Sequence, residues 1–168
     1  MTERFAGRAL RRPGDGAERQ PTMGEIGLNQ FAPYLMNRIA ARWNANMAEE
    51  LKAYDMTTLK MRTLAILSIS SALTINELAV YAVTEQSTMS RTLDALEEQG
   101  LIRRQPRPDD LRVREVTITE EGRAAFEKVW PMMYERFSQM FDGVDEEEYR
   151  TFTTTLHKLL HNIRRHEL

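Results

Sequence analysis

Cysteine is absent from this chain of 168 residues. Disulfides, thiolate metal sites and oxidant sensing through a thiol are therefore excluded. No apolar run approaches the length that spans a bilayer, and the first residues carry no hydrophobic signal core. We therefore expect a cytoplasmic protein.

Residues of the common catalytic sites are also scarce. The sequence holds no Gly-rich phosphate loop and no Ser/His/Asp arrangement, and its histidines lie beyond residue 156. His157 and His161 stand four residues apart, a helical spacing that can chelate zinc. No HExxH motif or nearby acidic cluster supports such a site. We predict no enzyme, no cofactor and no metal site.

The overall charge lacks the basic excess that is typical of nucleic-acid binders, because the formal net charge is −2 and the pI is about 6.0. The charge is unevenly distributed, however. Residues 101–114 hold two aspartates, Asp109 and Asp110, against five arginines: Arg103, Arg104, Arg107, Arg112 and Arg114. Residues 120–148 hold nine acids and three bases. One cationic segment and one acidic region are therefore predicted.

Two short capped helices are predicted between Thr74 and Gly100. Thr74 and Glu77 have the spacing of a capping box. The first helix carries apolar residues at core spacing: Leu78, Ala79, Ala82 and Val83. We expect Thr84 to cap the second helix, with Glu85 in its first turn, and Gly100 to take the left-handed position that ends it.

The second of these helices is amphipathic. Met89, Leu93 and Leu96 form an inward stripe, while Ser87, Arg91, Asp94 and Glu98 lie on the opposite face. The outer face is neutral or cationic in its first turns and acidic later. Only the first turns are suited to a DNA groove.

A hairpin follows Gly100. Residues 101–105 resemble a short strand, and residues 106–110 form the predicted turn. In the return strand Val116 and Ile118 alternate with polar residues, as expected of a strand with one buried face. Two short helices followed by a basic hairpin indicate a winged helix-turn-helix, a DNA-binding arrangement.

Residues 63–122 resemble the MarR (multiple antibiotic resistance) family of transcriptional regulators. The resemblance rests on Leu-Ala-Ile-Leu at 64–67, on Leu78-Ala79, on the run from Ser90 to Arg104, and on Asp110-x-Arg112 followed by residues 117–122. Weaker similarity extends from about Leu28 to about Leu160. The resemblance implies a mainly α fold with a small β-hairpin wing, in which a winged helix-turn-helix lobe joins a helical dimerisation region.

The resemblance also implies a function. A homodimer would bind an inverted-repeat operator in double-stranded DNA, commonly as a repressor released by a small aromatic or anionic effector. The arginine that matches Arg112 sits at the wing tip and enters the minor groove, oriented by the aspartate that matches Asp110. Family members that sense oxidants through a cysteine offer no parallel, because this chain has none.

Four regions are expected along the chain. Residues 1–24 form a disordered basic tail, which is either solvated or a DNA-contacting arm. Residues 25–56 carry a first long helix, from about Asn29 to Tyr54, for dimerisation. Residues 57–119 form the winged lobe. Residues 120–168 hold two dimerisation helices with apolar stripes at 3-4 spacing, the first interrupted by Pro131.

The predicted DNA-binding residues lie on the second short helix and the wing. On the helix they are Gln86, Ser87, Thr88, Ser90 and Arg91; on the wing they are Arg107, Asp110, Arg112 and Arg114. Arg91 is the candidate for base reading, against the alternative of a solvated helix arginine. Arg112 is the candidate for minor-groove reading, against the alternative of a simple turn ion pair with Asp110. Arg107 and Arg114 are weaker candidates for phosphate contacts.

An effector site is suggested by the first long helix. Arg38 and Arg42 could supply an anion partner and Trp43 an aromatic wall, although Trp43 also belongs to the apolar stripe and suits a dimer core. A winged helix that docks proteins without binding DNA is the competing interpretation. Such a module has little use for arginines around an Asp-rich turn. The operator, the effector and the sign of regulation are not encoded in any recognisable motif.

Overall fold

The computed structural model describes residues 22–163. The chain divides into two compact units between Lys52 and Ala53. The predicted tail at 1–24 falls mostly outside the described residues, but its last two positions belong to a short helix, α2 (Met23–Ile26). Among residues 22–163 no helix combines the length and the hydrophobicity that a membrane crossing requires.

The first unit contains α2, the 3-10 turn η1 (Leu28–Gln30) and the long helix α3 (Ala32–Leu51). A second 3-10 turn, η2 (Lys52–Tyr54), follows at the division. The long helix was predicted to begin near Asn29, which instead lies in η1. Phe31 has an extended backbone and Pro33 occupies the first turn of α3. Proline is suited to that position because the first N–H groups of a helix have no intrahelical partner.

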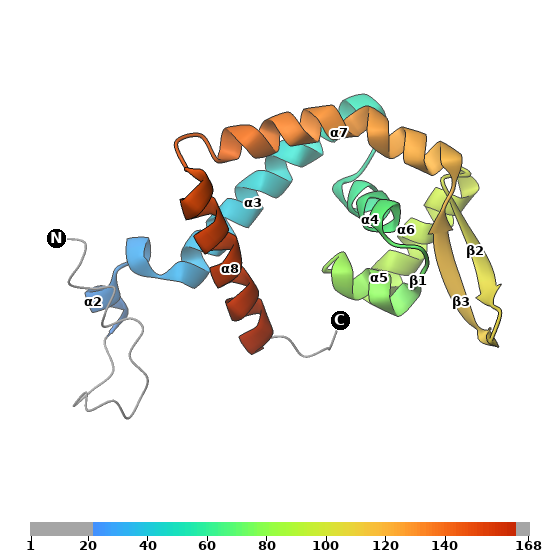
Figure 1. The fold of residues 1–168 in the computed structure, drawn as a ribbon, viewed down its shortest axis with the longest axis horizontal. Helices are drawn as coiled ribbons and strands as arrows, with labels where there is room; N and C mark the ends of the chain where they lie inside the picture. The colour runs from blue at the N-terminus through green and yellow to red at the C-terminus, as the bar shows by residue number, and fades with distance from the viewer. Residues whose placement is uncertain (1–21, 164–168) are drawn as a thin grey trace. The chain divides into compact units, whose positions relative to one another are not determined.

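The second unit holds the predicted winged helix-turn-helix, which the structure confirms (Figure 1). Its elements are α4 (Thr58–Ile69), β1 (Leu73–Thr74), α5 (Ile75–Tyr81), α6 (Gln86–Glu98), β2 (Ile102–Arg107), β3 (Asp110–Ile118), α7 (Glu120–Met140) and α8 (Glu146–Ile163). The three strands form one antiparallel sheet in the order β1-β3-β2. Strands β2 and β3 form the hairpin that we call the wing.

The core of this unit lies between α4, α5, α6 and the sheet. The inward stripe of α6 is confirmed, because Met89, Leu93 and Leu96 are fully buried. These side chains pack in one cluster with further residues from the other elements: Leu64, Leu67, Leu78, Ala79, Ala82, Ile102 and Val116. Burial of this apolar surface is the main force that holds the helices against the base of the wing.

The turn between α5 and α6 differs from the prediction. Val83 was expected in the core, but it is 82% exposed and has a left-handed backbone with φ 53°. That conformation is strained for a β-branched residue. Thr84 does not cap α6: the N-cap is Glu85, which makes no side-chain capping bond. Helix α5 ends at Tyr81, and Val83 and Thr84 form part of the turn that leads to α6. Val83 is therefore not a core residue, and Thr84 is not a helix cap.

The wing has a tighter turn than predicted. Arg107 pairs with Asp110, which leaves only Pro108 and Asp109 in the loop. Pro106 lies inside β2, next to a register shift. A proline is tolerated there because β2 is an edge strand and Pro has no N–H to contribute to a ladder. The predicted five-residue turn was therefore too long.

Two predicted helix starts are confirmed in the C-terminal part. The Thr119 hydroxyl accepts the Gly122 N–H at the start of α7. Asp145 and Glu148 form a complete capping box before α8, with bonds of 3.0 and 2.9 Å. At Gly122 helix α7 passes so close to Leu101, the residue before β2, that a Cβ would overlap the Leu101 carbonyl oxygen. Helix α7 ends at Met140, before Gly143, which has φ 80°.

Aromatic rings connect α7 with α8. Successive ring centroids lie 4.9–6.3 Å apart. The rings belong to Phe126, Trp130, Tyr134, Phe137, Phe141, Tyr149 and Phe152. Ring contacts of this kind stabilise the pairing of the two helices. No described residue of α8 is fully buried.

Candidate nucleic-acid interface

The first turns of α6 present small polar groups and one cation. Gln86, Ser87, Thr88 and Arg91 are exposed, whereas Ser90 is half-buried. Within residues 22–163 the Arg91 guanidinium has no hydrogen-bond or ion-pair partner. Its free donors can therefore meet a base or a phosphate.

The later part of α6 is acidic, and two of its acids, Asp94 and Glu97, are bound to the wing. The Nη2 atom of Arg104 lies 2.6 Å from Asp94 Oδ1, and its Nε lies 3.5 Å from Glu97 Oε2. The Arg104 N–H also donates to Glu97 Oε1 at 3.1 Å. Sequence reasoning missed this network. The available signal was a pair of acids at i and i+3, followed by a cation just past the end of the helix.

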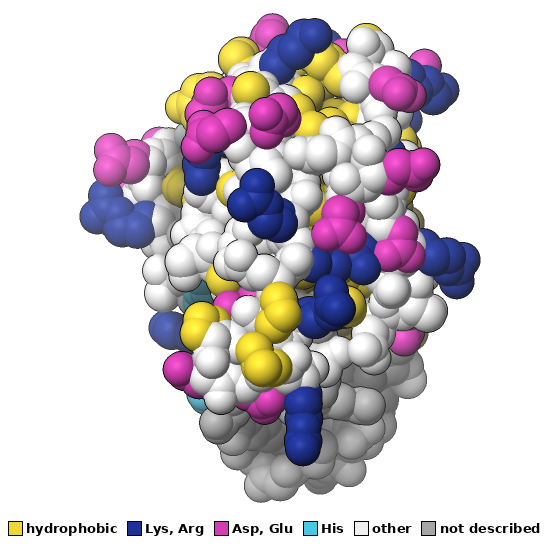
Figure 2. Space-filling model, turned by 90° about the vertical axis from the view of Figure 1, so that its right-hand side faces the viewer, with side chains coloured by type: hydrophobic (Ala, Val, Ile, Leu, Met, Phe, Trp, Pro, Cys, Tyr) yellow, Lys and Arg dark blue, Asp and Glu magenta, His cyan; other side chains and the backbone are white. Residues whose placement is uncertain are grey.

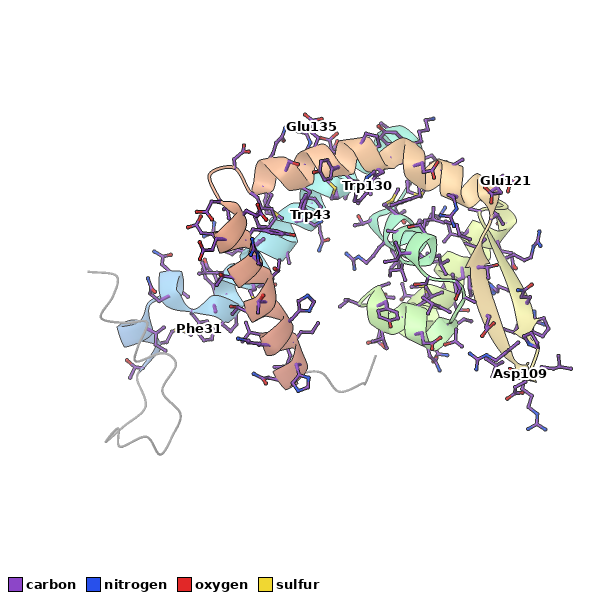
Figure 3. All side chains as sticks on the ribbon, viewed as in Figure 1. Phe31, Trp43, Asp109, Glu121, Trp130 and Glu135 are labelled. Atoms are coloured by element: carbon purple, nitrogen blue, oxygen red, sulfur yellow. The ribbon has the colours of Figure 1, made fainter. Side chains whose placement is uncertain are left out.

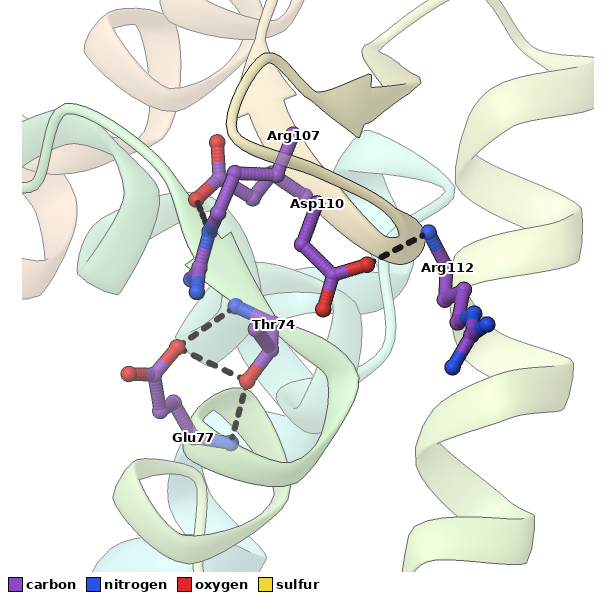
Figure 4. A network of polar contacts seen from close by, with 6 residues as sticks. Thr74, Glu77, Arg107, Asp110 and Arg112 are labelled. Atoms are coloured by element: carbon purple, nitrogen blue, oxygen red, sulfur yellow. Dashed lines mark hydrogen bonds and ion pairs between the residues drawn. The ribbon is translucent and has the colours of Figure 1, made fainter.

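The wing tip is organised by Asp110. Its Oδ1 atom accepts a hydrogen bond of 3.0 Å from the main-chain N–H of Arg112. In Figure 4 the Arg112 guanidinium lies apart from Thr74, Glu77 and Arg107, and the contact drawn at Arg112 is that of its main-chain nitrogen with Asp110. No ion pair joins Arg112 to Asp110 within the described part of the chain. The carboxylate therefore acts on the main chain of Arg112, rather than gripping its side chain as a turn ion pair would.

The predicted phosphate contacts of the wing divide into one paired and one unpaired arginine. The Nε atom of Arg107 lies 2.6 Å from Glu115 Oε1, and this hydrogen bond raises the pKa of Arg107. Arg107 is therefore already occupied by a carboxylate. Arg114 and Arg103 are exposed and have no side-chain partner among residues 22–163. Of the five arginines near the wing, two are thus neutralised.

The capping box lies close to the base of the wing. Thr74 is paired with Glu115 across the sheet. The Thr74 N–H and hydroxyl both donate to Glu77 Oε2 at 2.7 Å, and the Glu77 N–H donates back to the Thr74 hydroxyl at 3.3 Å. The main-chain N–H of Thr74 contributes most to lowering the pKa of Glu77, and its hydroxyl contributes next. The network is drawn in Figure 4.

Both ends of the wing carry acids. Asp109 marks the tip, and Glu121 marks the opposite end, where α7 begins with two exposed acids (Figure 3). Figure 2 shows that cationic, acidic and apolar side chains are intermingled on the face that carries the wing. Next to Arg112, Leu111 is 76% exposed and adds an apolar group near the tip. The face is therefore mixed in charge, and at the tip the unpaired Arg112 lies close in sequence to Asp109 and Asp110.

The comparison with known proteins agrees with this geometry. The model of the MarR family matches residues 56–113, which include α4 to the first part of β3. A solved MarR-family transcriptional regulator from Silicibacter pomeroyi is 46% identical, with coverage of 88% of this chain and 100% of that chain and a TM-score of 0.83. The chain belongs to the MarR family. It is therefore a transcriptional regulator and not an enzyme.

Two further relatives have informative names. The HTH-type transcriptional repressor IacR of Pseudomonas putida is 29% identical to this MarR protein over 143 residues, which are 85% of this chain and 86% of the relative. MepR of S. aureus, solved as a DNA complex, is 25% identical, with coverage of 78% of this chain and 97% of that chain and a TM-score of 0.68.

The candidate effector residues of this MarR protein lie together on α3. Arg38 and Arg42 are exposed and Trp43 is half-buried. The Arg38 guanidinium carbon lies 5.7 Å from the ring centroid of Tyr34, a cation–π distance. Arg38 is thus already near an aromatic ring one helical turn away. Trp43 is labelled in Figure 3.

The candidate zinc pair lies on α8, where His157 and His161 are both exposed. Within residues 22–163 no three or more His, Asp or Glu side chains are gathered in a way that could hold a metal ion. Two histidines alone leave a zinc ion short of the three or four protein ligands that it usually has.

The capping box makes a testable contribution to stability. Because folding lowers the pKa of Glu77, its carboxylate stabilises the fold above a pH of about 4.3. This stabilisation is lost as the pH falls through the lower pKa of the folded state. We expect Glu77→Gln to reduce the free energy of unfolding at neutral pH by about 0.5–1 kcal/mol. The difference from the wild type should shrink on acidification.

Denaturant titrations at a series of pH values would measure both effects. Glu98→Gln is a suitable control, because it removes an exposed acid that has no hydrogen-bond partner among the described residues. A Glu77→Gln deficit that stays constant on acidification would show that the carboxylate charge does not stabilise α5.

Proposed function

We propose that this MarR-family regulator represses transcription by binding an inverted-repeat operator as a homodimer, and that a small aromatic or anionic effector releases it. The observation that carries the proposal is which arginines of α6 and the wing tip lack an acidic partner. Arg91 on α6 and Arg112 at the wing tip lack side-chain partners among residues 22–163, while Arg104 and Arg107 are paired with acids. The unpaired cations occupy the two elements that a winged helix presents to DNA.

Helix α6 is suited to the major groove. Its exposed first turns combine short polar side chains with Arg91, whose guanidinium can donate two hydrogen bonds to guanine O6 and N7. Ser87 and Thr88 are short enough to let the helix approach the bases. Ser90 is half-buried and is the weakest candidate of this group. In this proposal each lobe reads one half-site, and the half-site centres lie about 10 base pairs apart.

The wing tip is suited to the minor groove. A narrow minor groove concentrates negative potential and attracts an arginine side chain. Asp110 supports this role because it accepts a hydrogen bond from the Arg112 main-chain N–H. This bond fixes the main-chain position from which the Arg112 side chain extends. Arg114 adds an unpaired cation two residues further along β3, for phosphate contact. Arg107, which is bound to Glu115, is the weakest phosphate candidate of the wing.

Single substitutions would test this division of labour. The preferred duplex would first be selected from fragments of the source genome. Arg91→Ala should then cost about 1–3 kcal/mol on that duplex and blur the preference at one base position. Arg112→Ala should weaken binding and reduce the slope of log affinity against log salt by about one, since a cation in the groove displaces counterions.

Lys128→Ala is the matched control, because it removes an exposed charge from α7. It should change neither quantity. Unaltered affinity and base preference in Arg91→Ala would mean that this residue reads nothing, and an unaltered salt slope in Arg112→Ala would remove the wing from the interface. Failure of the wild type to bind any duplex at low salt would instead favour the protein-docking alternative.

Uncovered apolar surface on α7 and α8 supports the homodimer. On α8, Phe152 is 42%, Leu159 39% and Ile163 76% exposed. On α7, Trp130 and Tyr134 are also exposed. Stripes at 3-4 spacing are suited to packing against another helix. We therefore assign residues 25–56 and 120–168 to dimerisation, and residues 57–119 to DNA binding.

Sedimentation of the full chain would test the dimer. The wild type should sediment as a dimer at micromolar concentration. The double substitution Leu159→Glu with Ile163→Glu should produce monomers, because charges in an apolar seam are costly to bury. It should also weaken binding to the two-site operator. Thr154→Glu, on the other face of α8, is the control and should remain dimeric. A monomeric wild type would contradict the proposal.

Kinship supports repression and DNA binding, and the side chains of α3 support an effector. IacR is named as a transcriptional repressor, and MepR was solved with DNA. Arg38, Arg42 and Trp43 combine cations with an aromatic ring on one helix, which is suitable for an aromatic carboxylate.

Calorimetric titration with aromatic carboxylates should give heat and reduce DNA binding, and Arg42→Ala should diminish both the heat and the effect on DNA binding. Absence of heat and of any effect on DNA binding would contradict this class of effector.

A further inference from the structure

Arg104 occupies a special place in the wing. It pairs with Val116 across β2 and β3, and Val116 pairs in turn with Leu73 of β1. Residues paired in this way project from the same face of a sheet. Val116 is fully buried, so Arg104 extends from the face of the wing that covers the core. Its side chain is only 14% exposed, and its guanidinium lies at the acids of α6.

We propose that Arg104, Asp94 and Glu97 form a clamp that holds the wing at a defined position relative to α6. The clamp thereby sets the spacing between the bases that Arg91 and Arg112 read. Arg104 is a positioning residue in this proposal and does not touch DNA. The DNA-related part rests on the proposed function; the clamp itself is a property of the free protein.

The geometry of the guanidinium supports a positioning role. Arginine presents its donors in a rigid planar fork. Here Nη2 donates to Asp94, while Nε lies 3.5 Å from Glu97 Oε2 as a charge contact and has no hydrogen-bond partner among the described residues. The main-chain N–H of Arg104 adds a third contact to Glu97. Two hydrogen bonds and one longer charge contact from one residue restrict rotation of the hairpin about its base more than a single ion pair would. Lysine carries the same charge without this fork.

The charges of α6 support a second effect. Asp94 and Glu97 follow Arg91 by three and six residues on the same helix, and both remain partly exposed. Free carboxylates so close to a DNA-reading turn would repel phosphates. Arg104 offsets one of these two negative charges from the protein side. The clamp thus reduces by one charge the repulsion between the acidic second half of α6 and phosphate.

A matched control is adjacent in the sequence. Arg103 carries the same charge on the same strand but pairs with Thr117, and its side chain is exposed without a partner among residues 22–163. Arg103→Gln therefore removes one wing charge and leaves the clamp intact. Arg104→Gln removes charge and clamp, whereas Arg104→Lys removes the fork and keeps the charge.

The first measurement uses the full chain without DNA. Amide hydrogen exchange of the wing would be compared with that of α4, whose exchange reports global unfolding. Arg104→Gln and Arg104→Lys should accelerate exchange in the wing relative to α4, and Arg103→Gln should not. Equal exchange in wild type and both Arg104 variants would overturn the clamp.

The second measurement uses the selected operator and versions with one base pair added or removed between the positions read by α6 and by the wing. The wild type should discriminate against the altered spacings. Arg104→Gln should bind the selected operator about tenfold more weakly, as expected within one ion-pair network, and should lose this discrimination. Arg104→Lys should recover affinity but not discrimination. The triple variant with Asp94→Asn, Glu97→Gln and Arg104→Gln should likewise recover affinity for the operator without recovering discrimination between spacings.

The outcomes separate the clamp from the proposed function. Wild-type discrimination retained in Arg104→Gln, or lost equally in Arg103→Gln, would overturn the positioning role even though DNA binding stands. If the wild type binds no duplex, the proposed function and the positioning of bases both fail, and hydrogen exchange alone decides whether the wing is clamped to α6.

Discussion

Burial of one face of the wing against α6 is the constraint from which the rest of the interface follows. Ile102 and Val116 join the core that α6 closes with its apolar stripe. Since strand side chains alternate, this burial decides which arginines turn towards α6 and which turn away. Arg104 is directed to the acids of the helix, and Arg107 to Glu115 on the other face. Among the described residues, the wing cations without a carboxylate partner are Arg103, Arg112 and Arg114, all of which are exposed.

Electrostatics in this protein is therefore a matter of pairing more than of total charge. The chain is formally negative, and even the arginine-rich segment is partly neutralised by Asp94, Glu97 and Glu115. Unpaired cations remain on the two elements that the proposed function assigns to DNA. Such an arrangement limits non-specific attraction to phosphate, which depends on the number of free cations. Contact with DNA bases then depends on the few side chains that remain unpaired.

Local features of the fold were predictable because they depend on residues close in the chain. The capping boxes at Thr74 and Asp145 each need only a partner three residues later. The buried stripe of α6 follows from helical periodicity. The errors arose where the chain reverses: the left-handed Val83 and the two-residue wing loop depend on how the flanking elements are packed. Propensity alone places Val in the core and favours a longer turn around two prolines.

The site divides in the same way. Sequence by itself determined the family, the presence of the wing, and the surface position of Arg91 and Arg112. The reason is that motifs, hydrophobic alternation and helix faces depend on residues that are close together in the chain. Only the tertiary structure decided that Arg104 and Arg107 are bound to acids and that Asp110 holds a main chain and not a guanidinium. The reason is physical: an ion pair between residues ten positions apart, such as Asp94 and Arg104, exists only after a helix and a strand have packed together.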